Sequence, residues 1–196
     1  MTLIIDEIRA HRIEAFNAKD SNAPVCFLAT TDAHGQPQVR TLVLREINDT
    51  DLILFINASS PKWEQLQSNP QCQVLLWYAT LNIQYRITGK AEALPASAIR
   101  DNWHKRPHRA KVLDYFYDTV TPQSSTIASR NALLERFDEI NRDVSPSQLQ
   151  PSPAALGIRI LLEQIERLDL TEEGLPHLRQ RFNFRDASWS ETTLVP

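Results

Sequence analysis

Short segments with the patterning of β-strands follow one another through the first half of the chain, and this order most constrains its fold. The five segments are 25–31, 38–46, 51–57, 71–79 and 82–94. Turn signals such as Asp32-Ala-His-Gly35 and Asn48-Asp-Thr-Asp51 lie between them. A helical middle follows, and then come three more strand-like segments at 157–170, 177–186 and 188–195. This order predicts one antiparallel barrel with helical insertions.

Helical signals occur in four places. Residues 3–17 space apolar side chains three or four positions apart, as an amphipathic helix does. Ser60 and Pro61 suit the start of a short helix that ends at Asn69-Pro70. Two further helices are expected at 95–104 and 128–141, the second with an apolar face. A Pro/Ser-rich segment at 145–155 predicts a flexible connector inside a single domain, 1–196, of the α+β class and mainly β.

Composition and residue spacing argue against several classes of function. The four glycines are at least 17 residues apart, so neither a dinucleotide-binding GxGxxG loop nor a Walker A loop is present. The formal net charge is −3, which argues against nucleic acid as a partner. The amino-terminal residues mix charges with apolar positions, unlike a signal peptide, and no apolar run is long enough to span a membrane. Cys26 and Cys72 lie in apolar strand-like runs, so we expect two buried thiols in a soluble, cytoplasmic protein.

Two clusters of polar residues have more than one reading. His104 and His108 are four apart, but Pro107 between them favours surface histidines over a metal site. The stretch Arg100–Lys111 holds five Lys/Arg residues. It is either a solvated face or a site for an anionic small molecule, with Trp103 as an aromatic surface, and nucleic acid ranks third.

A possible phosphate site involves Arg40 and the helix start at residue 60. Arg40 alternates with apolar residues in its strand, and a buried arginine there needs a negative partner. Ser60 and Lys62 stand at a helix N-terminus, where backbone N–H groups favour anions. The alternatives for these residues are a core ion pair, an ordinary helix cap and a surface charge.

The ordered set of segments 29–45, 54–70, the Gln84 strand, 105–107 and 122–130, with the tail from Gln164 to Pro196, resembles the pyridoxamine 5′-phosphate oxidase family. The resemblance covers about residues 25–196. It implies an FMN-binding split β-barrel, antiparallel and Greek-key-like, with peripheral helices. It also implies a homodimer that holds each FMN between its subunits.

By position, the resemblance assigns FMN contacts as follows. Arg40 and Lys62 would hold the FMN phosphate, with Ser60 opening the same helix. The ring contacts would come from Thr41, Leu42, Val43, Leu44, Arg45, Gln84 and Arg181, and from Gln123 and Ser124 of the other subunit. For an anionic small-molecule substrate, the matching positions are Arg45, Arg106, His177 and Arg179. No metal ligand and no side-chain general base is assigned.

The chain also departs from the family pattern. Pro61 stands where the family has a phosphate-binding arginine, Phe55 and Ile56 replace two hydroxyl-bearing residues, and Leu168 replaces a tryptophan near the flavin. Of the substrate positions, Arg106 alone is retained outright, and His177-Leu178-Arg179 reverses an Arg-Leu-His motif.

The first hypothesis is an FMN-dependent oxidoreductase with an unassigned substrate, of which pyridoxamine 5′-phosphate is one candidate. The second is a non-catalytic module of the same fold that holds a flavin or a heme. The third is a dimeric interaction protein without a cofactor.

Overall fold

The computed structural model describes residues 4–103, 106–145, 149–171 and 174–196. The described residues form eight strands, five α-helices and a 3-10 helix at Ala79–Leu81. The strands are β1 (Val25–Thr31), β2 (Pro37–Ile47), β3 (Asp51–Asn57), β4 (Gln71–Tyr78), β5 (Ile83–Ala93), β6 (Ala155–Asp169), β7 (Leu178–Arg185) and β8 (Ser188–Leu194). The helices are α1 (Ile4–Asn17), α2 (Pro61–Ser68), α3 (Ala96–Trp103), α4 (His108–Thr119) and α5 (Arg130–Asp143).

The chain divides into two compact units. One comprises Met1–Leu54, Gln65–Glu92 and Ile158–Pro196, and the other comprises Phe55–Glu64 and Ala93–Gly157. The first unit contains α1 and most of the sheet, and the second contains α3, α4 and α5. A single domain over 1–196 stays a prediction.

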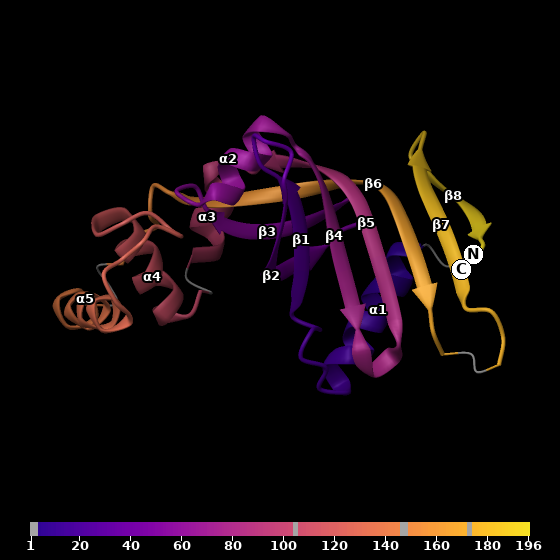
Figure 1. Cartoon of the computed structure of the whole chain (residues 1–196), viewed down its shortest axis with the longest axis horizontal. Coiled ribbons are helices and arrows are strands. Elements are labelled where there is room, and N and C mark those ends of the chain that lie inside the picture. The colour runs from indigo at the N-terminus through magenta and orange to yellow at the C-terminus, as the bar shows by residue number, and fades with distance from the viewer. Residues whose placement is uncertain (1–3, 104–105, 146–148, 172–173) are drawn as a thin grey trace. The chain divides into compact units, whose positions relative to one another are not determined.

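The sheet closes into a barrel. Its strands are ordered β3-β2-β1-β4-β5-β6-β7-β8, and β3 also pairs with β6, which joins the first six strands in a ring (Figure 1). The segment β3-β2-β1-β4 has the strand order of a Greek key, because β4 returns to pair with β1. The predicted antiparallel, mainly β barrel with peripheral helices is therefore confirmed.

Alternation of side chains builds the barrel core, as the sequence predicts. In β5 the residues Ile83, Tyr85 and Ile87 are buried, whereas those between them are partly or fully exposed. The fully buried side chains of the first unit include Leu28, Leu44, Leu52, Leu54, Leu76, Tyr85, Ile87 and Ile160. All eight strands fall within two residues of the bounds expected from the sequence.

Gly89 allows β5 to approach β6 closely. A Cβ atom at this position would lie 2.2 Å from the carbonyl oxygen of Leu161 and 2.9 Å from Cγ2 of Ile160. No side chain larger than hydrogen fits there without movement of the β6 backbone. The glycine in this strand therefore serves the packing of the barrel.

Helix α1 packs through Ile4, Ile5, Ile8 and Ala15, which are buried. Phe16, near the end of the same helix, is 49% exposed, and the guanidinium of Arg12 lies 5.5 Å from its ring centroid. No helix in the described ranges is long and apolar enough to cross a membrane.

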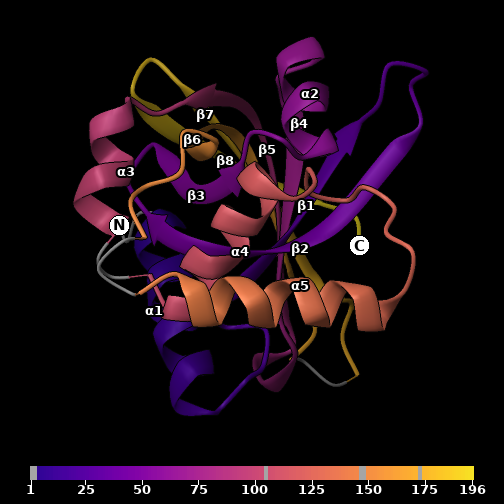
Figure 2. The same ribbon diagram turned by 90° about the vertical axis from the view of Figure 1, so that its left-hand side faces the viewer.

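In the second unit, the sequence prediction missed α4. Pro107, which follows the helix expected at 95–104, stands at the N-cap of α4, where its lack of an N–H costs nothing. Figure 2 shows α5 alongside α4. The expected connector 145–155 is described except for 146–148, and its Leu149 is buried and accepts a hydrogen bond from Nε1 of Trp103 at 2.8 Å. His104 and Lys105 lie outside the described residues.

Candidate functional site

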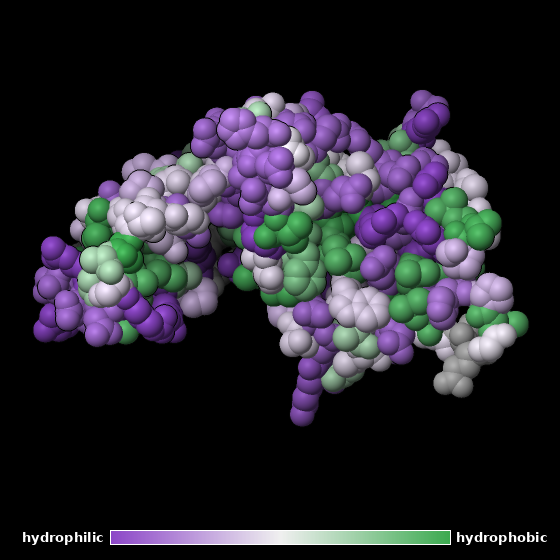
Figure 3. Space-filling view, in the orientation of Figure 1, coloured by the Kyte–Doolittle hydropathy of each residue, from purple (hydrophilic) through white to green (hydrophobic). Residues whose placement is uncertain are grey.

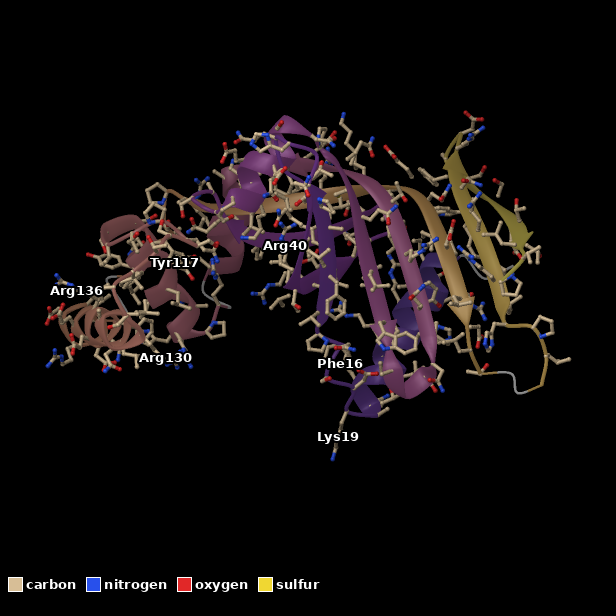
Figure 4. All side chains as sticks on the ribbon, viewed as in Figure 1. Phe16, Lys19, Arg40, Tyr117, Arg130 and Arg136 are labelled. Atoms are coloured by element: carbon tan, nitrogen blue, oxygen red, sulfur yellow. The ribbon has the colours of Figure 1, made fainter. Side chains whose placement is uncertain are left out.

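Arg40 is a half-buried cation with neutral partners. From β2 its Nη1 donates to Oγ1 of Thr30 at 2.6 Å and to the carbonyl oxygen of Leu28 at 3.3 Å, and its Nη2 donates to Oε1 of Gln65 at 3.0 Å (Figure 4). Among the described residues, no carboxylate lies within salt-bridge distance of this guanidinium. Burial lowers the pKa of Arg40. The ion pair expected for a core arginine is thus absent from this part of the chain, and the charge is available to an anionic ligand.

The rest of β2 alternates as expected. Leu42 is half-buried and Leu44 is buried, whereas Thr41 and Val43 are exposed on the opposite face. The pairing with β3 shifts its register between Leu44 and Glu46, and Arg45 lies exposed at this irregularity. Strand β2, whose backbone the resemblance assigns to the flavin ring, therefore has one face towards the core and one exposed face.

Three arginines surround Glu166, a residue for which the sequence analysis proposed no role. Nε and Nη2 of Arg181 donate to Oε1 of Glu166, Nη2 of Arg179 donates to Oε2 at 3.0 Å, and Arg86 pairs with the same oxygen. Glu166 is 7% exposed, and burial alone would raise its pKa. The hydrogen bonds from the arginines outweigh burial and lower the pKa to about 2. The cluster is therefore ionised and carries a net positive charge.

The strands around this cluster hold two more of the residues considered in the sequence, and a third lies just before β7. Gln84 is half-buried on β5 opposite Trp77, and no side-chain hydrogen bond joins it to another residue within the described ranges. Leu168 on β6 pairs with Arg179 on β7. His177 is exposed just before β7 begins. The structure thus groups Arg179 with Arg181, and leaves His177 in solvent.

The start of α2 forms a second polar cluster. Ser60 is buried and its hydroxyl donates to the carbonyl oxygen of Asn57 at 2.6 Å. The Asn57 side chain accepts from the backbone N–H of Ser59, and the Ser59 hydroxyl accepts from the backbone N–H of Gln123. Nζ of Lys62 donates to Oε1 of Gln123 at 3.2 Å. Lys62 and Gln123, which the resemblance assigns to opposite subunits, therefore touch within one chain.

Ser124 follows Gln123 with a backbone φ of 72°. This left-handed conformation is uncommon for a residue with a side chain, and such strain often occurs at ligand sites. Pro61 is the first residue of α2, and Phe55 is a half-buried residue of β3. Both belong to the second unit. Ile56 is buried.

Arg106 forms an ion pair with Asp114 of α4, with 2.6 Å between Nη1 and Oδ2. The Arg106 guanidinium lies 5.2 Å from the ring centroid of Trp103, and Lys111 lies 5.7 Å from it. Trp103 is 5% exposed, so it does not offer the open aromatic surface considered for this basic stretch. Burial raises the pKa of Asp114, and the attraction of Arg106 only partly offsets that rise.

Sequence reasoning did not identify Glu166, Asp114, Thr30 or Gln65. A signal existed for Glu166, because an acidic residue in an apolar strand precedes the alternating arginines of 179–181. Asp114 had no such signal, since its helix was not predicted. No group of three or more potential metal ligands was found in the described part of the chain.

The chain is similar to known proteins along most of its length. The sequence profile of the family described as pyridoxamine 5′-phosphate oxidase matches residues 12–142. The chain belongs to the pyridoxamine 5′-phosphate oxidase family. A relative in this family, the pyridoxine/pyridoxamine 5′-phosphate oxidase of Escherichia coli, is 30% identical over 186 residues, which is 93% of this chain and 82% of the relative.

Solved structures share the fold of this pyridoxamine 5′-phosphate oxidase family member. PhzG from Burkholderia lata, in complex with tetrahydrophenazine-1-carboxylic acid, superposes with a TM-score of 0.86 at 22% identity, over 100% of this chain and 94% of that one. A pyridoxamine 5′-phosphate oxidase-related, FMN-binding protein from Nostoc punctiforme superposes with a TM-score of 0.78, also at 22% identity, over 97% of this chain and 96% of that one.

Proposed function

We propose that the chain is an FMN-dependent oxidoreductase that acts on a small anionic molecule. The observation that carries this proposal is Arg40, a half-buried guanidinium whose partners among the described residues are neutral oxygens. A cation held in that way suits a phosphate, which accepts strong charge-assisted hydrogen bonds. Membership of the pyridoxamine 5′-phosphate oxidase family, and an FMN-binding protein of the same fold, support FMN as the source of that phosphate.

The residues present fit the chemistry of FMN. Arg40 would bind the phosphate, and we assign Lys62 and Ser60 to the same group from the family resemblance. Gln84 has a side-chain amide with no partner among the described residues, which suits the polar edge of the ring. The backbone of 41–45, Arg181, Gln123 and Ser124 complete the assignment. When bound, FMN would supply the acceptance of electrons from the substrate.

The protein's own part would be positioning. Glu166 fixes Arg181 and Arg179, the residues that we assign to the flavin and to the substrate. Arg45, Arg106 and His177 are the other proposed substrate contacts, and the two arginines favour an anion. No described side chain is needed as a general base in this proposal.

We also propose a homodimer, with FMN held between the subunits. Val39 and Val43 on the open face of β2 are 68% and 48% exposed. The register places them beside Ala29 and Val25 of β1, on a face that is apolar. Figure 3 shows hydrophobic side chains gathered over β1 and β4, with a hydrophilic patch beside them. A second copy would cover such a face, and sedimentation should find a dimer at micromolar concentration.

We place the protein in the cytoplasm. Cys26 and Cys72 are free and buried, and burial raises the pKa of both thiols to about 12. Unpaired thiols of this kind suit a reducing compartment.

The absorption spectrum of the purified protein, recorded after incubation with FMN and desalting, tests the cofactor. We expect retained flavin bands close to one equivalent per chain. A folded dimer that retains no flavin would contradict the proposal, and would show that Pro61, Ile56 and Leu168 have removed the site. Retained flavin that no donor reduces would favour a non-catalytic flavin- or heme-binding module instead.

A further inference from the structure

The ion pair between Arg106 and Asp114 is enclosed within the second unit. The side chains of Arg106 and Asp114 are 15% and 6% exposed, and 2.6 Å separates Nη1 from Oδ2. At this distance and depth the two charges interact strongly, because little water screens them. The pair as a whole is electrically neutral.

Asn57 and Trp103 lie against the two partners of the pair. Nδ2 of Asn57 donates to Oδ1 of Asp114 at 3.4 Å, and the ring of Trp103 lies 5.2 Å from the guanidinium carbon of Arg106. The Trp103 indole is itself fixed by its bond to Leu149. The guanidinium is therefore restrained on its Asp114 side and stacked on its flat face.

The Nε donor of this guanidinium is not satisfied within the described part of the chain. Nε of Arg106 is buried, and within the described residues it has no hydrogen-bond partner. A buried donor without a partner costs free energy unless a ligand or water accepts from it. The positive charge of Arg106 is, by contrast, already balanced by Asp114.

We infer that Asp114 is a specificity-determining residue, which makes the Arg106 site take a neutral or singly charged acceptor rather than a phosphate dianion. The inference rests on the proposed function, in which Arg106 contacts the substrate. A dianion at Arg106 would meet a carboxylate on the same guanidinium, so repulsion would cancel much of the attraction that a lone arginine gives to phosphate. A neutral or singly charged acceptor would meet less of this repulsion. The ligand of the Burkholderia relative is a carboxylic acid, not a phosphate ester.

A matched pair of ligands tests this inference. 4-Deoxypyridoxine and its 5′-phosphate differ in one phosphate group, and neither can be oxidised at the 4′ carbon. Their dissociation constants are measured by equilibrium dialysis against the full chain, with and without added FMN. We expect the wild-type protein to bind the two rings within about threefold of each other, because the pair at Arg106 is neutral. Asp114→Asn should prefer the phosphorylated ring by at least about tenfold, since it frees the charge of Arg106.

Two further variants make the result specific. Asp143→Asn removes an exposed carboxylate at the end of α5 and should leave the wild-type ratio unchanged. Adding Arg106→Gln to Asp114→Asn should abolish the phosphate preference. Far-UV circular dichroism checks that each variant folds, and where Asp114→Asn does not fold, the wild-type ratio alone decides.

A wild-type protein that prefers the phosphorylated ring by about tenfold or more would overturn the inference, as would an Asp114→Asn variant with an unchanged ratio. Flavin retention is read separately from the absorption spectrum. A chain that binds no FMN but gains phosphate affinity on Asp114→Asn would contradict the proposed cofactor and support the inference. A chain that binds FMN but gains no phosphate affinity in the Asp114→Asn variant would support the proposed cofactor and contradict the inference.

Discussion

Two nitrogens of Arg181 donate to a single oxygen of Glu166, with Nε at 3.0 Å and Nη2 at 2.7 Å. This geometry fixes both the position and the plane of the guanidinium. Because Arg179 and Arg86 donate to the other oxygen, one carboxylate orients three cations on neighbouring strands. Glu166 is therefore a positioning residue for the part of the site that we assign to flavin and substrate.

Removal of the Glu166 charge should destabilise the fold. Glu166→Gln keeps the shape but leaves three arginines close together without their anion. We expect a loss of about 2 kcal/mol in the free energy of unfolding, less than for a fully buried pair because the arginines are partly solvated. Urea unfolding measures the change, and Glu163→Gln on the exposed face of the same strand is the control. Equal losses for the two variants would contradict a special role for Glu166.

Acid should weaken the wild-type protein through the same residue. The pKa of Glu166 falls from 4.5 to about 2 on folding, so its contribution is fully present above pH 4.5 and is lost as the pH falls towards 2. Urea midpoints measured between about pH 5 and pH 2.5 should fall more steeply for the wild-type protein than for Glu166→Gln. Parallel pH profiles for the two proteins would refute this assignment.

Substitution of Arg40 should separate ligand binding from stability. Arg40→Gln removes a half-buried charge that has no described anionic partner, while the bond from Thr30 to Gln65 at 2.6 Å can remain. We expect FMN affinity to fall by about tenfold or more, with a free energy of unfolding that is unchanged or higher. Fluorescence titration with FMN and urea unfolding give the two values. Arg185→Gln, at the exposed end of β7, should change neither; unaltered FMN affinity in Arg40→Gln would exclude its phosphate role.

Substitution by alanine should destabilise the protein at two glycines, for different reasons. In Gly89→Ala the new Cβ would meet the Leu161 carbonyl oxygen at 2.2 Å, so the barrel must shift and we expect a loss of more than about 2 kcal/mol. Gly35 has a φ of +77° and nothing within 4 Å, so Gly35→Ala should cost only about 1 kcal/mol of backbone strain. In thermal unfolding, Gly89→Ala should have a lower midpoint temperature than Gly35→Ala. The opposite order would show that β5 and β6 separate easily.

The strands could be predicted because each carries its own signal. Alternation in 83–87 and the turn residues of 32–35 are local, and they survive without knowledge of the rest of the chain. Helix α4 was missed because a proline can follow the end of one helix or stand at the start of the next, and Pro107 stands at the start of α4. Only the surrounding fold decides between them.

Site residues, too, could be predicted only where the signal is local in the sequence. The identity of Arg40 and Lys62 as cations came from the sequence, but their partners did not, because those partners are distant along the chain. The convergence of 86, 179 and 181 on Glu166 joins three strands, and only the alternating arginines of 179–181 gave a signal for it. The pairing of 106 with 114 depends on a helix that was not predicted. Their roles as ligand contacts stay predictions.

The pairing that closes the barrel also has a consequence for biosynthesis. The backbone N–H of Leu162 donates to the carbonyl oxygen of Thr50 at 2.9 Å, across more than a hundred intervening residues. A nascent chain therefore carries β3 as an unpaired edge until β6 has left the ribosome. During that interval the early strands offer their open backbone to any neighbouring chain, so the cell's chaperone capacity, more than the final stability, should set the yield of folded protein.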